Sequence, residues 1–150
     1  MQTYDIPFIP SSDDSVKTMM KLARPQKGET AVDLGAGDGK LVIALAQRGV
    51  YVTGVEIDEE RWSLINARIK ISQLQDLAKT IHGNLWEQDL SNYDLIVLYG
   101  VTSIMERLES KIKNEAKSTC RVVSNRFEFP TWQPAEVLDH VYLYRLQKAQ

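Results

Sequence analysis

Short apolar runs alternate along the chain with segments whose apolar residues recur every third or fourth position. A short apolar run bounded by turn residues is typical of a buried strand, and the recurring pattern is typical of an amphipathic helix. The runs predict five strands, over Thr30–Leu34, Tyr51–Ile57, Lys79–His82, Asp94–Tyr99 and Thr119–Ser124. The fourth of these, DLIVLY, is apolar after its first residue, which indicates a strand covered on both faces.

Four helices are predicted, one before the first strand and one after each of the first, second and fourth strands. Ser11 or Ser12 begins the first helix as a cap. The second helix ends near Gly49, and Asp58 caps the third. Their apolar positions are Val16, Met19, Met20 and Ala23, then Leu41, Ala44 and Leu45, then Trp62, Ile65 and Ile69, then Ile104, Leu108 and Ile112.

Strand–helix alternation at this spacing predicts a parallel sheet with helices on both faces, and right-handed crossovers make it doubly wound. Beyond Pro134 the pattern changes, because Glu136–Leu138 and Val141–Leu146 suit two terminal strands with no helix between them. We therefore expect an α/β fold, a single doubly wound domain over residues 1–150 with a mostly parallel sheet and a C-terminal antiparallel strand. The opening residues, stiffened by Pro7 and Pro10, are predicted to form an extended arm.

The bulk composition narrows the class of protein. Of the 150 residues, 43% are hydrophobic and 25% charged, as in ordinary soluble domains. A net charge of −2 offers no broad attraction to nucleic acid or an anionic membrane, and no apolar run approaches the ~20 residues that span a bilayer. The only cysteine, Cys120, excludes an internal disulfide, and the start MQTYDIPFIP lacks the features of a signal peptide. We expect a cytoplasmic protein with no membrane partner.

Residues suited to ligand binding follow several of the predicted strands. A glycine-rich loop follows the first strand, Glu56 lies at the end of the second, Asn84 follows the third, and Tyr99 ends the fourth. In doubly wound sheets, ligands bind beyond the carboxyl ends of the strands. These four positions therefore predict one site along that edge of the sheet.

The glycine loop matches neither common phosphate-binding pattern. It reads Gly35-Ala36-Gly37-Asp38-Gly39-Lys40, with lysine where the dinucleotide fingerprint has its third glycine, and the chain has no G-K-[ST] sequence. Asp33 and Asp38 would also repel a phosphate, whereas they would attract a cation.

An acidic residue about 20 positions after the loop is suited to the two hydroxyls of a ribose, and Glu56 occupies that place. A ribose, a positive charge and no pyrophosphate together describe S-adenosylmethionine. Asp33 could hold its ammonium group and Asn84 could contact the adenine edge. The predicted cofactor-binding residues are Asp33, Gly35, Ala36, Gly37, Glu56, Ile57, Asn84 and Leu85. The alternative is that the glycines only form a tight turn and that Glu56 caps a helix.

Several segments also resemble a known family. VDLGAGDGK, GVEID and GNLWEQDLS resemble the first three motifs of class I S-adenosylmethionine-dependent methyltransferases. FIPSSDDSVKTMMKLA, RVVSNRFEFPTWQP and VYLYRL resemble segments of small prokaryotic protein-lysine methyltransferases, which are relatives of the enzymes that methylate lysine in the c-ring protein of ATP synthase. The resemblance covers nearly the whole chain. It implies a Rossmann-like methyltransferase domain, with residues 1–12 as an arm over the cofactor site and a lysine-bearing protein as substrate.

The chain departs from this family at the end of the fifth strand. Asn125 stands where the relatives usually carry histidine, and Arg126 stands where they carry an acid. Ser11 replaces a threonine and keeps the hydroxyl, and Ser12 replaces a proline. An arginine that faced the acceptor pocket would oppose a lysine ammonium.

Candidate residues for the methyl acceptor each have a structural alternative. Tyr99 and Glu128 are the catalytic candidates: Tyr99 could contact the amine or pack in the core, and Glu128 could orient an ammonium or be an exposed loop carboxylate. The predicted substrate-binding residues are Phe8, Ser11, Asn125 and Trp132. Of these, Phe8 and Trp132 could wall the acceptor channel or serve only in packing. No metal is expected, because His82 and His140 are far apart in the chain and lack a ligand cluster.

Four functions remain open at this point. Methylation of protein lysine is the leading hypothesis. An RNA or small-molecule methyltransferase is second, although LYGVTS stands in the place of the N/D-P-P-[YF] motif that methylates amino groups of bases. A non-catalytic cofactor-binding module is third, and a nicotinamide-binding protein is disfavoured by the glycine spacing. The sequence leaves open the protein target, the number of methyl groups added and the oligomeric state.

Overall fold

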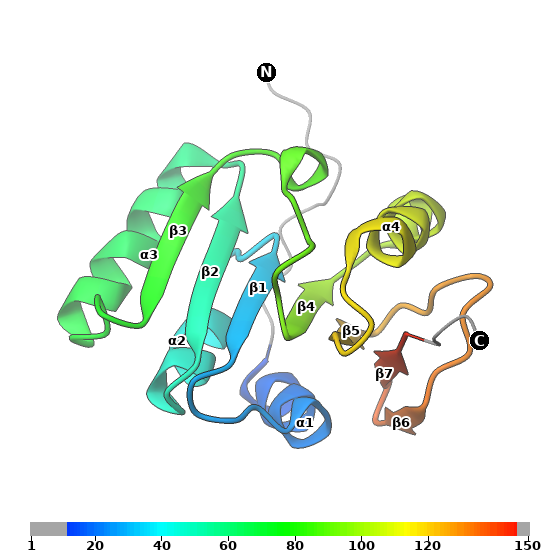
Figure 1. The fold of residues 1–150 in the computed structure, drawn as a ribbon. Helices are drawn as coiled ribbons and strands as arrows, with labels where there is room; N and C mark the ends of the chain where they lie inside the picture. The colour runs from blue at the N-terminus through cyan, green and yellow to red at the C-terminus, as the bar shows by residue number, and fades with distance from the viewer. Residues whose placement is uncertain (1–11, 147–150) are drawn as a thin grey trace.

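A computed structural model describes residues 12–146 and shows one seven-stranded sheet in the order β3-β2-β1-β4-β5-β7-β6 (Figure 1). The strands are β1 (Thr30–Leu34), β2 (Tyr51–Glu56), β3 (Ala78–His82), β4 (Leu95–Tyr99), β5 (Arg121–Asn125), β6 (Glu136–Leu138) and β7 (Val141–Arg145). The first five are parallel to one another, whereas β7 is antiparallel to both β5 and β6. The strand order reverses between β1 and β4, so the carboxyl ends of these two strands form the switch point.

Four helices and one short 3₁₀ turn, η1 (Leu85–Glu87), connect the strands. The helices are α1 (Asp13–Ala23), α2 (Lys40–Gln47), α3 (Glu59–Ile71) and α4 (Thr102–Glu115). Buried residues of α1, α2 and α3 pack with one face of the sheet, and those of α4 pack with the other. The sheet is therefore covered by helices on both faces, as predicted.

The structure contains the N-caps that the sequence predicts for α1 and α3. The side chain of Ser12 accepts a hydrogen bond from the Ser15 N–H at the start of α1, and the side chain of Asp58 accepts one from the Arg61 N–H at the start of α3. An N-cap of this kind satisfies one of the free N–H groups of a first helical turn. Within the described residues, no helix is both long and apolar enough to cross a bilayer.

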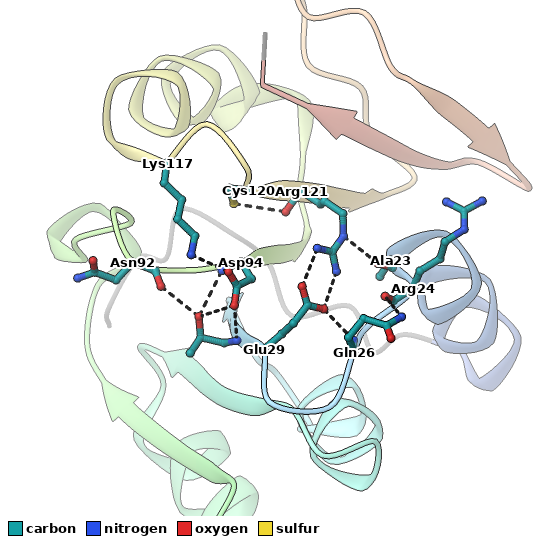
Figure 2. A network of polar contacts seen from close by, with 10 residues as sticks. Ala23, Arg24, Gln26, Glu29, Asn92, Asp94, Lys117, Cys120 and Arg121 are labelled. Carbon is teal, nitrogen blue, oxygen red and sulfur yellow. Dashed lines mark hydrogen bonds and ion pairs between the residues drawn. The ribbon is translucent and has the colours of Figure 1, made fainter. Parts of the chain in front are cut away.

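Charged side chains join the amino ends of β1 and β5 (Figure 2). Arg121, the first residue of β5, makes two hydrogen bonds of 2.9 Å to the carboxylate of Glu29, just before β1, and a third of 3.0 Å to the Ala23 carbonyl. Both side chains of this ion pair are largely buried. The pair fixes the amino edge and thereby sets how the carboxyl ends of the strands align.

A second ion pair at this edge joins β4 to the segment before β5. Asp94 lies 2.6 Å from the Lys117 amine and accepts the Thr30 N–H at 2.9 Å. The hydrogen bond from Lys117 is the main reason that the pKa of Asp94 is below its usual range. Cys120 lies one residue before β5 rather than within it, and burial raises the pKa of its thiol to about 12. This thiol is therefore not a reactive group at neutral pH.

Candidate functional site

The glycine loop joins the end of β1 to the start of α2. Gly35 and Gly37 have φ values of 85° and 59°, in the left-handed region that favours glycine. The N–H groups of Gly35 and Ala36 both donate to the Val55 carbonyl at 2.9 Å, which anchors the loop to β2. The loop backbone is therefore held in place next to the end of β2.

Glu56, the last residue of β2, is 4% exposed and is connected to this loop. One of its carboxylate oxygens accepts the Gly37 N–H at 2.7 Å. The other accepts the Asp58 N–H at 3.0 Å and lies 3.4 Å from Nε of Arg61. Because a carboxylate has about four acceptor positions, Glu56 can hold these three partners and still accept one ribose hydroxyl.

Asp33, on β1, is almost fully buried below the loop. Burial raises the pKa of its carboxyl to about 8, and the neighbouring carboxylates of Glu56 and Asp38 act in the same direction. Three acidic groups close together make this end of the sheet unfavourable for a phosphate and favourable for a cation. This arrangement agrees with the cation preference inferred from the sequence.

The segment after β3 completes this side of the site. Asn84 caps η1, with its side-chain oxygen 2.9 Å from the Trp86 N–H, and Leu85 is buried. Ile57, directly after Glu56, is 36% exposed and presents an apolar surface at the end of β2. The ring of His82 stacks on that of Trp62, with centroids 5.1 Å apart.

On the acceptor side, Tyr99 and Asn125 are partners in the register of β4 and β5. Side chains alternate along a strand, so both lie on the same face as Leu95, Val97 and Val123, the face that packs on α1. Tyr99 is partly buried, and its ring lies 6.2 Å from that of Phe127. Asn125 is 1% exposed, and its Nδ2 has no hydrogen-bond partner among residues 12–146.

The remaining acceptor candidates lie in different surroundings. Glu128 is exposed in the loop after β5. Trp132, predicted as a wall of the acceptor channel, instead packs between Phe129 and Tyr144 in the core on the α4 face, and its Nε1 donates to the Arg145 carbonyl. The structure thus supports the packing alternative for Trp132. Phe8, Ser11 and the rest of the predicted arm before Ser12 lie outside the described residues.

Three residues that the sequence analysis did not select also shape the site. Arg61 contacts Glu56, Arg68 donates to the Asp38 carbonyl at 2.7 Å, and Phe127 lies beside Tyr99. The sequence contains a local signal for Arg61, because this residue lies about one helical turn after the cap Asp58. Arg68 reaches a loop 30 residues earlier in the chain, and no local signal indicates that contact. Across the described residues, no group of His, Cys, Asp and Glu side chains could hold a metal ion.

Two clefts among the described residues lie away from the predicted cofactor-binding residues. One, of about 500 Å³, lies between α1, α2 and α3, and the other, of about 420 Å³, lies near the amino ends of β2 and β3.

The strand order, the antiparallel β7 and the acid at the end of β2 define a Rossmann-like methyltransferase fold. Residues 33–136, more than half of the chain, match the ANTKMT methyltransferase domain. The chain belongs to this family.

Curated relatives agree with this assignment. The chain is 32% identical to the Homo sapiens lysine N-methyltransferase that is named for the C subunit of ATP synthase, over 93% of this chain and 61% of that protein. It is also 32% identical to a protein-lysine N-methyltransferase of Saccharolobus islandicus, over 93% of this chain and 92% of that protein. The chain thus spans about three fifths of the human relative and nearly all of the archaeal one.

One similar solved structure is named for RNA as its substrate, whereas the relatives above are named for protein lysine. An RNA methyltransferase from Salinibacter ruber, in complex with S-adenosyl-L-homocysteine, superposes with a TM-score of 0.85 and 28% identity, covering 92% of each chain. The shared fold therefore serves proteins with different named acceptors, and the acceptor has to be argued from the site.

Proposed function

We propose that this protein transfers the methyl group of S-adenosylmethionine to the ε-amine of lysine in a protein substrate. The observation that carries the proposal is the group of acids around the glycine loop, Asp33, Asp38 and Glu56, because it suits a cofactor with two positive charges and no phosphate. The lysine acceptor is supported by the named activities of the human and archaeal relatives.

Each part of the cofactor has residues suited to it. Glu56 accepts a ribose hydroxyl, Asp33 faces the ammonium group directly or through water, and the bare backbone of Gly35 and Gly37 allows close approach. Ile57 supplies an apolar surface for the adenine ring, and the segment Asn84–Leu85 lies next to the edge of that ring.

The reaction needs alignment more than acid–base catalysis. The methyl group leaves a sulfonium, so the cofactor is already activated, and the protein has to bring the amine in line with the S–CH₃ bond. A lysine amine has an unperturbed pKa of ~10.4 and must lose a proton before it attacks. Desolvation and the adjacent sulfonium both lower that pKa, so a strong general base is not required.

RNA is the second candidate acceptor, because the Salinibacter ruber structure is that of an RNA methyltransferase. The negative charge at the carboxyl edge disfavours RNA as the acceptor. Glu59, Glu60, Glu128 and Asp139 are exposed at or next to strand ends and loops of this edge and would repel a phosphate backbone, whereas the exposed Arg126 at this edge carries the opposite charge. The same carboxylates attract a lysine-bearing segment.

The substrate class can be tested with radiolabelled S-adenosylmethionine and total cell extract. The labelled products are divided and treated with either protease or ribonuclease, and the protein fraction is hydrolysed so that methylated lysine can be identified by mass spectrometry. Loss of label to protease alone, with methyl-lysine in the hydrolysate, is the expected result. Loss of label to ribonuclease alone would overturn the lysine proposal in favour of RNA.

A further inference from the structure

Asn125 occupies a specific place along the carboxyl edge of the sheet. The strand order β1-β4-β5 places Tyr99 between Asp33 and Asn125, and all three side chains lie on the α1 face. A cofactor held by Asp33 and the glycine loop lies over β1 and the switch point. An amine that approaches its methyl group from the β5 side therefore meets Tyr99 and Asn125.

The amide of Asn125 has no evident structural use. It lies in the last rung of the sheet, opposite Val141 of β7, and its Nδ2 is buried without a hydrogen-bond partner in the part of the chain that the structure describes. An unpaired buried donor destabilises a folded protein, and an apolar side chain of the same shape is neutral or more stable. The amide is thus kept at this position at the expense of stability, which indicates a partner that arrives with the substrate.

We propose that Asn125 orients the lysine amine, an inference that rests on the proposed function. Rotation of the side-chain amide by about 180° exchanges the positions of Nδ2 and Oδ1. This rotation breaks no hydrogen bond of Nδ2 to the described residues. Oδ1 then accepts one N–H of the amine, which arrives alongside the partly exposed ring of Tyr99. With that N–H fixed, the nitrogen lone pair is directed at the sulfonium methyl.

The transfer step is balanced without any other reactant. The ammonium first releases one proton to solvent. The nitrogen lone pair then forms the N–CH₃ bond, the S–CH₃ bond breaks, and its electron pair returns to sulfur, which becomes a neutral thioether. Oδ1 can accept an N–H from the ammonium, from the neutral amine and from the methylated product, so the amide holds the nitrogen throughout.

The central test is Asn125→Leu, which keeps the size and removes the amide. Initial rates are measured with total extract protein as the acceptor, and methyl-lysine is quantified after hydrolysis. We expect kcat to fall about 10- to 100-fold, the scale of a misaligned reacting group, while the thermal unfolding midpoint stays equal or rises. Cofactor affinity, measured by calorimetry, should be unchanged. A lower unfolding midpoint together with the lost activity would instead indicate a structural role and overturn the inference.

Asn125→Asp provides a second, independent readout. A carboxylate attracts the ammonium more strongly and also holds its proton more firmly, so the apparent KM should fall, kcat at neutral pH should fall, and the pH at which kcat rises should move upward. The other titratable groups nearby are Asp33, on the same face across β4, together with Tyr99, Arg126 and His140, and they are the same in both proteins. An unshifted pH profile would contradict the inference.

Thr53→Val is the matched control, because Thr53 is a buried polar residue of the sheet far from the acceptor side. It should leave kcat and KM unchanged. If the wild type forms no methyl-lysine, the proposed function fails. If the wild type forms methyl-lysine and Asn125→Leu does so at the same rate, only the role of Asn125 fails.

Discussion

The carboxylate of Glu56 at the end of β2 accepts the N–H of Gly37 at 2.7 Å, so the predicted ribose acceptor also holds the glycine loop. The two parts of the cofactor site are therefore one hydrogen-bonded unit before any ligand binds. A substitution that removes the whole side chain of Glu56 would disturb both parts together. Tests of the ribose contact need a side chain that keeps an oxygen in place.

Glu56→Gln meets that requirement at the loop, because its amide oxygen can still accept the Gly37 N–H, while its amide nitrogen replaces the oxygen that accepts the Asp58 N–H. The loss of the charged acceptor should weaken S-adenosylmethionine by about 1.5–3 kcal/mol, the scale of a hydrogen bond to a charged group. Calorimetry measures the affinity, and thermal unfolding checks the fold. Glu59→Gln, an exposed acid in the first turn of α3, is the control. Unchanged affinity in a folded Glu56→Gln protein would refute the ribose assignment.

Gly37→Val should reduce cofactor affinity at least as much as the change at Glu56. Gly37 has φ 59°, which a β-branched residue tolerates poorly, and its side chain would block the approach of the cofactor to the backbone. Gly28→Val is the matched control, because Gly28 also has a positive φ but has open space around it and lies before β1. If both variants lose affinity equally, backbone strain rather than the site explains the loss.

Binding of S-adenosylmethionine should release a proton from Asp33. Because the pKa of Asp33 is raised to about 8, its carboxyl is mostly protonated at pH 7 in the free protein, and a bound cation lowers that pKa. Calorimetry in buffers with different ionisation enthalpies counts the released protons. Asp33→Asn should abolish the release and lower the affinity, whereas the exposed Asp76→Asn should change neither. Equal proton release in wild type and Asp33→Asn would contradict this assignment.

Asp33 also predicts how the stability of the free protein depends on pH. Its folded pKa of about 8 is above the ordinary value of 3.8, so the unfolded chain loses the proton first as pH rises. The free energy of unfolding should therefore decrease between the ordinary aspartate range and about pH 8. Denaturant titrations across that range should show a smaller decrease for Asp33→Asn.

Glu29→Gln should lower stability and leave cofactor affinity unchanged. The variant loses the charge that pairs with Arg121, and we expect about 1.5 kcal/mol because a fifth of the Glu29 side chain is exposed. The hydrogen bond from Arg121 lowers the pKa of Glu29, so this contribution is present above the ordinary glutamate range and is lost as pH falls through the lowered pKa. Urea titrations at neutral and acidic pH measure the difference. Glu136→Gln, which breaks the exposed pair with Arg24, should have a much smaller effect.

Arg126→Glu should lower the apparent KM for protein substrate and leave cofactor affinity unchanged. Arg126 is exposed next to Asn125, and its fixed positive charge opposes an arriving lysine ammonium. Initial rates with total extract protein measure the change, and Arg48→Glu, exposed after α2, controls for net charge. A clear rise in KM would favour an anionic acceptor instead.

The sequence predicted the central strands well because β1, β4 and β5 are mostly buried apolar runs, but several strand ends depend on distant partners. Ile57 looks like the end of a strand, yet β2 ends at Glu56, whose carboxylate accepts the Asp58 N–H. The fifth strand begins at Arg121, two residues later than expected, where the pair with Glu29 joins residues 92 positions apart. Such a pair leaves no periodic signal in the chain.

The site was harder to predict than the fold. The glycine spacing and the acid at the end of β2 are local patterns, so they could be located from the sequence. Whether an aromatic residue lines a channel depends on which face of the sheet it covers. Trp132 packs beside Tyr144 because the loop after β5 turns toward α4, and the residue types alone do not determine that turn.

The ion pairs that hold the strands together and the residues proposed to contact the acceptor lie at opposite edges of the sheet. Glu29, Arg121, Asp94 and Lys117 hold the strands at one edge, whereas the acceptor residues lie at the opposite edge. Under the roles proposed for Asn125 and Arg126, a substitution at either position changes substrate preference and leaves these framework contacts in place.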